Sequence, residues 1–125
     1  MSAVVDTSVF IDVLRGSEAA GNLLARRRAT GPLHSSLVVK AEVLSGIRKA
    51  EEPSTRELLS SIEWHDVDEA IVEDAGRLGR QWLPSHNGID TADLLIAATA
   101  QTLDAPLLTR NVKHFPMFPG LLRPY

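Results

Sequence analysis

The sequence predicts an α/β fold in which a short parallel sheet is flanked by helices on both sides. Its strand-like segments, such as residues 2–5 and 107–109, are short and apolar on both faces, which is typical of buried parallel strands. Segments with helical spacing separate these strands, as crossover connections between parallel strands require. With 125 residues, the chain is long enough for one domain with a modest core of its own.

Each strand and helix is predicted from its apolar pattern and from the residues at its ends. Strands are expected over residues 2–5, 33–36, 64–67 and 107–109. Helices are expected over residues 7–14, 17–28, 37–49, 53–62, 69–83 and 91–103. A Pro-rich loop follows the last strand, over residues 110–120.

End signals and burial patterns support these assignments. Asp6, Thr7 and Ser8 supply capping side chains for the first helix, and Gly16 ends it. Pro53 suits the first turn of a helix. Residues 91–103 are almost wholly apolar or small, so this helix is expected at the centre of the fold.

Composition excludes several classes of site. The chain has no cysteine, which rules out disulfides, thiolate zinc sites and cysteine nucleophiles. No basic leader is apparent, and no apolar run approaches the roughly 20 residues of a membrane helix, so we expect a cytoplasmic protein without membrane contact. A net charge of -3 argues against coating nucleic acid by bulk charge but leaves room for local basic patches.

Four acidic residues lie where apolar side chains are expected. Asp6 follows the first strand, Glu42 lies beside Val43 in the third helix, and Asp90 and Asp93 begin the apolar helix. Each has a simpler explanation: Asp6 and Asp90 can act as N-caps, Asp93 can complement the helix dipole, and Glu42 can be solvated. Because burying carboxylates costs several kcal/mol without compensation, a shared divalent metal site explains them together.

The topology brings polar groups to one edge of the sheet. Asp6 ends the first strand and Asn111 follows the last, and parallel α/β sheets bind ligands outside the carboxyl ends of their strands. Several carboxylate oxygens suit Mg²⁺ or Mn²⁺, which can activate water for attack on a phosphodiester. The histidines show no metal-ligand spacing and are expected in surface or loop roles: His34, His65, His86 and His114.

Four segments, in this order, carry a resemblance to a known family. They are VVDTSVFID, KAEVLSGI, DLLIAATA and LLTRNVKHFPMFPGL. Together they resemble the PIN-domain family, and within it the toxin ribonucleases of VapBC toxin–antitoxin modules. The resemblance covers the whole chain and implies a single PIN domain over residues 1–125, with a parallel sheet between helices.

The resemblance also implies roles for individual residues. Asp6, Glu42 and Asp93 correspond to the catalytic, metal-binding acids, and Asp90 offers a further metal-binding carboxylate. Supporting roles fall to Thr7 or Ser8, which would orient a ligand or water, and to Asn111, which stands where the family often has an acid. RNA phosphates would be contacted by Arg15, Arg48 and Arg110.

The function implied is a Mg²⁺-dependent endoribonuclease, with Mn²⁺ as a substitute, that cleaves structured RNA such as tRNA. It would act as a toxin, form a homodimer, and assemble into a hetero-oligomer with a VapB-like antitoxin. Two alternatives remain: a PIN-type nuclease in RNA or DNA processing without an antitoxin, and a degenerate PIN fold that binds proteins. The intact acidic set argues against the degenerate fold.

Overall fold

A computed structural model describes all residues, 1–125, and confirms the predicted α/β fold. The sheet has four parallel strands in the order β3-β2-β1-β4. These strands are β1 (Ala3–Val5), β2 (Leu33–Ser36), β3 (Glu63–His65) and β4 (Leu107–Leu108). The helices are α1 (Thr7–Leu14), α2 (Glu18–Thr30), α3 (Leu37–Ser45), α4 (Glu52–Leu59), α5 (Glu69–Trp82) and α6 (Thr91–Thr102).

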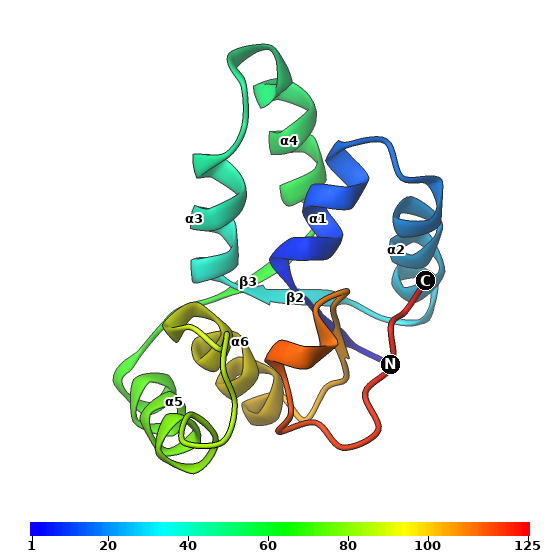
Figure 1. Cartoon of the computed structure of the whole chain (residues 1–125). Helices are drawn as coiled ribbons and strands as arrows, with labels where there is room; N and C mark the ends of the chain where they lie inside the picture. The colour runs from blue at the N-terminus through cyan, green and yellow to red at the C-terminus, as the bar shows by residue number, and fades with distance from the viewer.

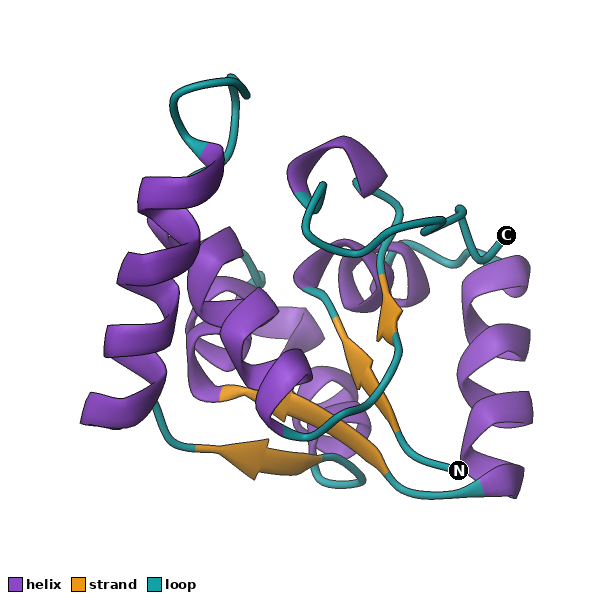
Figure 2. Cartoon of the chain, turned by 90° about the horizontal axis from the view of Figure 1, so that it is seen from below, coloured by secondary structure: helices purple, strands orange, loops and turns teal.

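Helices cover both faces of the sheet. Figure 1 shows α1, α3 and α4 above the strands and α5 and α6 below them. The four strand arrows in Figure 2 fan out but point toward the same side, as expected for a twisted parallel sheet. No helix has the length and apolar character needed to cross a membrane.

Helix α6 lies at the centre of the fold, as its composition predicts. It packs against β1, β2, α3 and α5, and it buries Ile96, Ala97, Ala98 and Ala100 almost completely. Small side chains along its length let these neighbours approach closely. The position of α6 matters for function because its N-cap is Asp90 and its first turn carries Asp93.

Several predicted boundaries are wrong, and the helix expected over residues 53–62, for example, ends at Leu59. The helix expected over residues 37–49 ends at Ser45, because Gly46 takes the C-cap position and a separate 3₁₀ turn follows at Lys49–Glu51. The strand expected over residues 64–67 runs instead over Glu63–His65, where it pairs with β2. The loop after β4 contains a 3₁₀ turn at Val112–His114, followed by the buried Phe115.

Strand register determines which side chains meet at the carboxyl edge of the sheet. Val5 of β1 pairs with Leu108 of β4, so the next residues, Asp6 and Thr109, leave the sheet side by side. The amide of Asp6 donates to the carbonyl of Leu108 at 2.9 Å. The short strands therefore fix Asp6 against the loop that follows β4.

Candidate active site

An acidic pocket of about 240 Å³ opens at the carboxyl edge of the sheet. It collects all four carboxylates predicted from the sequence. Its lining consists of Asp6, Thr7, Ser8, Ile11, Glu42, Asp90, Asp93, Arg110, Asn111 and His114. Residues more than 100 positions apart in the chain thus form one site.

Asp6 is buried and held by two hydroxyl groups. Its Oδ2 accepts hydrogen bonds from Ser8 Oγ at 2.9 Å and from Thr109 Oγ1 at 2.7 Å. Asp6 occupies the N-cap position of α1, but its side chain accepts no amide of that helix. The capping explanation therefore does not account for this carboxylate, which is only 4% exposed.

The two hydroxyl groups also hold the loop after β4. The amide of Arg110 donates to Ser8 Oγ at 3.1 Å, and the amide of Asn111 donates to Thr109 Oγ1 at 3.0 Å. The sequence predicts Ser8 as a supporting residue but does not single out Thr109. The place of Thr109 directly after the strand that pairs with β1 is the signal that could have revealed it.

Glu42 reaches the pocket from α3 and is exposed to solvent. Its Oε1 accepts a hydrogen bond from Thr7 Oγ1 at 2.7 Å. The two hydroxyl residues proposed as supports therefore serve different acids, because Thr7 contacts Glu42 and Ser8 contacts Asp6. Solvation explains why Glu42 is exposed, but it does not explain why Glu42 lines the same pocket as Asp6.

Asp90 and Asp93 form a reciprocal cap at the start of α6. The amide of Asp93 donates to Asp90 Oδ1 at 2.8 Å, and the amide of Asp90 donates to Asp93 Oδ2 at 3.1 Å. Asp90 is exposed, whereas Asp93 is only 8% exposed. The capping explanation is thus correct for this pair, although both side chains also line the pocket.

Burial raises the pKa of Asp93 from 3.8 to about 6, and the nearby charges of Asp90 and Asp6 add to this increase. The hydrogen bond from the Asp90 amide and the charge of His114 act in the opposite direction. A carboxylate in this setting is poorly compensated, because repulsion and burial outweigh its favourable contacts. Binding a cation would relieve both effects.

His114 was expected in a surface or loop role, and the structure also places it at this site. Its Nδ1 lies 3.1 Å from Asp93 Oδ2. Arg110 lines the pocket as well, whereas Arg15 and Arg48 lie outside it, at the end of α1 and before the 3₁₀ turn. No spacing motif marks His114, which reaches Asp93 only because the loop after β4 folds back.

Comparisons with known proteins identify the fold family. Residues 3–116 match the PIN domain. The chain belongs to the PIN-domain family. It is 46% identical to ribonuclease VapC19 of Mycobacterium tuberculosis over 98% of both chains. It is 43% identical to ribonuclease VapC10 of the same organism, over 98% of this chain and 92% of the relative.

A solved structure agrees with this assignment. The PIN domain matches a chain of a toxin–antitoxin complex from Klebsiella pneumoniae with a TM-score of 0.82 and 32% identity. The match covers 98% of each chain. The resemblance to VapC toxins read from the four sequence segments is confirmed.

The donor chemistry of the PIN-domain pocket suits a hard divalent cation. Asp6, Glu42 and Asp93 offer carboxylate oxygens, the ligands that Mg²⁺ prefers. The raised pKa of Asp93 reflects its burial first and the charges of Asp90 and Asp6 second. No three acidic or histidine side chains are oriented here as a ready coordination sphere. Glu42, for example, is turned to Thr7.

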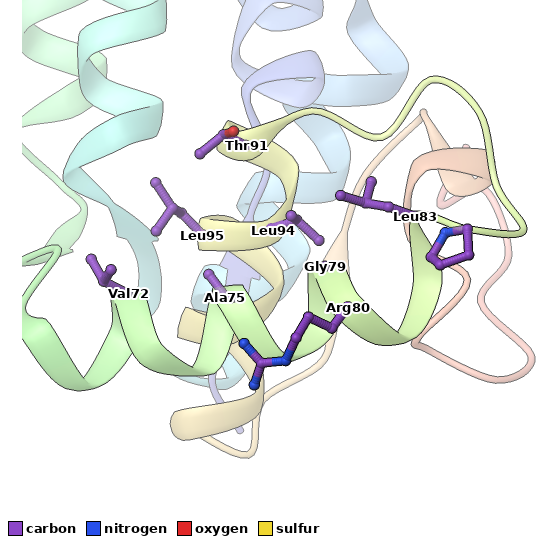
Figure 3. Close-up of a pocket in the computed structure, with 10 residues that line it drawn as sticks. Val72, Ala75, Gly79, Arg80, Leu83, Thr91, Leu94 and Leu95 are labelled. Atoms are coloured by element: carbon purple, nitrogen blue, oxygen red, sulfur yellow. The ribbon is translucent and has the colours of Figure 1, made fainter.

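The largest hollow of the PIN domain lies elsewhere. It has a volume of about 740 Å³ and lies between α5 and α6, where Figure 3 shows Val72, Ala75, Leu94 and Leu95 around it. Arg80 is its one charged residue, and no carboxylate or histidine lines it. Phosphodiester chemistry therefore has its candidate groups in the smaller acidic pocket.

Proposed function

We propose that this PIN domain is a Mg²⁺-dependent endoribonuclease that acts as the toxin of a toxin–antitoxin pair and cleaves structured RNA such as tRNA. One observation carries the proposal: Asp6, Glu42 and Asp93 come from three distant segments and line a single pocket. Similarity to VapC19 and VapC10, both named ribonucleases, supports the choice of RNA as substrate.

The proposed metal ligands are Asp6, Glu42 and Asp93, with Asp90 as an additional carboxylate. When bound, Mg²⁺ or Mn²⁺ would polarise the phosphoryl oxygen and activate water for in-line attack. Asn111 lines the pocket and can accept a hydrogen bond, but it adds no negative charge toward a second metal.

The surrounding groups keep these acids in place. Ser8 and Thr109 fix Asp6, Thr7 orients Glu42, and the Asp90 amide holds Asp93. Each of these hydrogen bonds fixes the position of a carboxylate oxygen, because a hydroxyl or amide donates to that oxygen. Arg110 at the rim supplies a positive charge toward the substrate backbone.

We further propose a VapB-like antitoxin as partner, a homodimer of the toxin, and a hetero-oligomer of the two in the cytoplasm. Similarity to a chain from a toxin–antitoxin complex supports the partner. An antitoxin arginine could pair with two carboxylates of the acidic pocket, a charge-assisted contact that would compete with Mg²⁺. Light scattering of the chain alone and with its partner tests both assemblies.

Expression in cells tests the function. The chain is induced briefly, with and without the product of the adjacent upstream reading frame, and new RNA 5′ ends are sequenced. We expect discrete cleavage sites in structured RNA that disappear when the partner is co-expressed. Cleavage that no neighbouring protein suppresses would favour the processing nuclease, and absence of cleavage at strong expression would favour the degenerate fold.

A further inference from the structure

A second pocket, of about 250 Å³, adjoins the acidic pocket and has the opposite charge. Its lining consists of Arg110, Asn111, Val112, Lys113, His114 and Arg123. Arg110, Asn111 and His114 line both pockets, so the two form one continuous surface. Lys113 and Arg123 belong to the second pocket alone, and it contains no carboxylate.

Two of the three positive charges of this basic pocket are not paired within the chain and are available to a ligand. Lys113 and Arg123 are exposed, and neither forms an ion pair within the chain. Three cationic side chains thus converge from the loop after β4 and from the C-terminal tail, in a chain whose net charge is -3. Such a local concentration of positive charge on an acidic protein is a specific feature of this surface rather than a consequence of composition.

Arg110 is held in place between the two pockets. Its Nε lies 3.3 Å from Asp12 Oδ2 on α1, and the same oxygen accepts a hydrogen bond from the Tyr125 hydroxyl at 2.5 Å. Burial and this hydrogen bond raise the pKa of the Tyr125 phenol, so the hydroxyl remains a donor. The Tyr125 contact also ties the tail that carries Arg123 to α1. Arg110 and the tail are therefore held in place before an anion binds, which lowers the entropic cost of binding.

We propose that the basic pocket binds an internal phosphodiester of RNA, the one next to the phosphodiester positioned at the acidic pocket. This proposal rests on the proposed function and adds a subsite to it. Arg110 and Lys113 would contact the phosphate from the loop after β4, and Arg123 from the tail. The acidic pocket would hold the reacting phosphate while the basic pocket fixes the direction of the strand.

Binding to RNA without cleavage tests the subsite. The probe is a fluorescent oligoribonucleotide without terminal phosphates, so every anion in it is an internal phosphodiester. Anisotropy is measured in EDTA over a range of salt concentrations for the wild-type chain and for Lys113→Gln/Arg123→Gln. The control is Arg77→Gln/Arg80→Gln, which removes the same charge from α5, on the side of the molecule away from the tail in Figures 1 and 2.

We expect Lys113→Gln/Arg123→Gln to weaken binding about tenfold, as for removal of a charge-assisted hydrogen bond. The slope of log affinity against log salt should fall by about 0.7 for each phosphate of the single strand that the variant no longer neutralises. The α5 control should leave both quantities near wild type. Equal decreases in affinity for the two double variants, or no decrease for Lys113→Gln/Arg123→Gln, would overturn the proposal.

Cleavage by the same variants separates the subsite from the proposed function. With Mg²⁺ present, removal of a phosphate subsite should raise KM more than it lowers kcat. If wild type cleaves RNA and Lys113→Gln/Arg123→Gln binds and cleaves it equally well, the subsite is wrong and the nuclease stands. If wild type never cleaves but binding still depends on Lys113 and Arg123, the nuclease is wrong and the phosphate site stands.

Discussion

At the scale of single residues, Asp93 combines two roles with opposite effects on stability. Its carboxylate completes the cap of α6, which stabilises the helix, but it does so in a buried position near Asp90 and Asp6. Burial and repulsion dominate, since the pKa of Asp93 is raised to about 6. The folded chain therefore loses stability when Asp93 ionises without a cation.

Asp93→Asn should stabilise the metal-free protein at pH 7. The folded chain binds the Asp93 proton more tightly than the unfolded chain, so its contribution to stability falls as pH rises from about 4 to about 6. Asn does not titrate and can still accept the Asp90 amide. Melting temperatures in EDTA should thus differ little at pH 4 and favour Asp93→Asn at pH 7. A difference that does not change with pH would contradict this account.

Thr109→Val should lower both the stability of the chain and the Mg²⁺ affinity of the acidic pocket, although it only replaces a hydroxyl group by a methyl group. The variant removes a hydrogen bond to the buried Asp6 and the acceptor for the Asn111 amide, at a cost of about 1–3 kcal/mol. Loss of a group that orients a metal ligand typically lowers metal affinity roughly 10–100-fold. Calorimetric Mg²⁺ titration and RNA cleavage measure the effect.

Thr99→Val on α6 is the matched control. Thr99 is also buried, and its hydroxyl bonds within the helix to the carbonyl of Leu95 at 2.9 Å. This variant should lower stability without reducing the Mg²⁺ affinity of the folded chain. Equal Mg²⁺ affinity in Thr109→Val and Thr99→Val would show that Thr109 does not support the site.

The chemistry of each side chain determines whether its role can be predicted from the sequence. Asp6, Glu42 and Asp93 could be predicted because a carboxylate in an apolar segment is conspicuous, and the resemblance implied their metal-binding roles. Thr109 could not, because threonine is ordinary at a strand end, and the contact of His114 with Asp93 depends on the path of a loop. Such contacts follow from strand register and loop folding rather than from local spacing.

At the scale of elements, helix ends determine both stability and the site. The strands and the buried α6 could be predicted because their apolar patterns are strong. The end of α3 could not, because Ile47 continues the stripe of Val39 and Val43, whereas the backbone leaves the helix at Gly46. The apolar periodicity favours a longer helix, whereas Gly46 favours a helix end, and only the tertiary structure shows which of the two prevails.

Removing the N-cap side chain of α5 and that of α6 should affect stability and RNA cleavage differently. Asp68 accepts the Ile71 amide at 2.9 Å at the start of α5, so Asp68→Ala should cost about 1 kcal/mol. Asp90→Ala should cost less, because it also removes a charge that repels the Asp93 carboxylate. Urea denaturation measures both values.

Cleavage by the same two variants shows which cap belongs to the site. Only Asp90→Ala should reduce RNA cleavage, because Asp90 lines the acidic pocket and Asp68 does not. If the two folded variants cleave RNA equally well, Asp90 acts only as a cap.

At the scale of the whole molecule, the fold brings three separate segments to one edge of the sheet. β1 delivers Asp6, α3 delivers Glu42, and the buried α6 delivers Asp93. The sheet and its central helix thus stabilise a site whose charges repel one another. Ligands that neutralise this charge, whether Mg²⁺ or an antitoxin side chain, should stabilise the folded chain by binding it preferentially.

Metal-dependent cleavage of RNA by the purified chain tests the central claim most directly. Structured RNA is incubated with wild type, Asp6→Asn, Glu42→Gln and Asp93→Asn over a range of Mg²⁺ concentrations, with folding checked by circular dichroism. We predict cleavage by wild type that rises with Mg²⁺, stops in EDTA, and falls by orders of magnitude in each folded variant. Full cleavage in EDTA, or full cleavage by folded Asp93→Asn, would contradict the assignment of the acidic pocket as a metal-dependent active site.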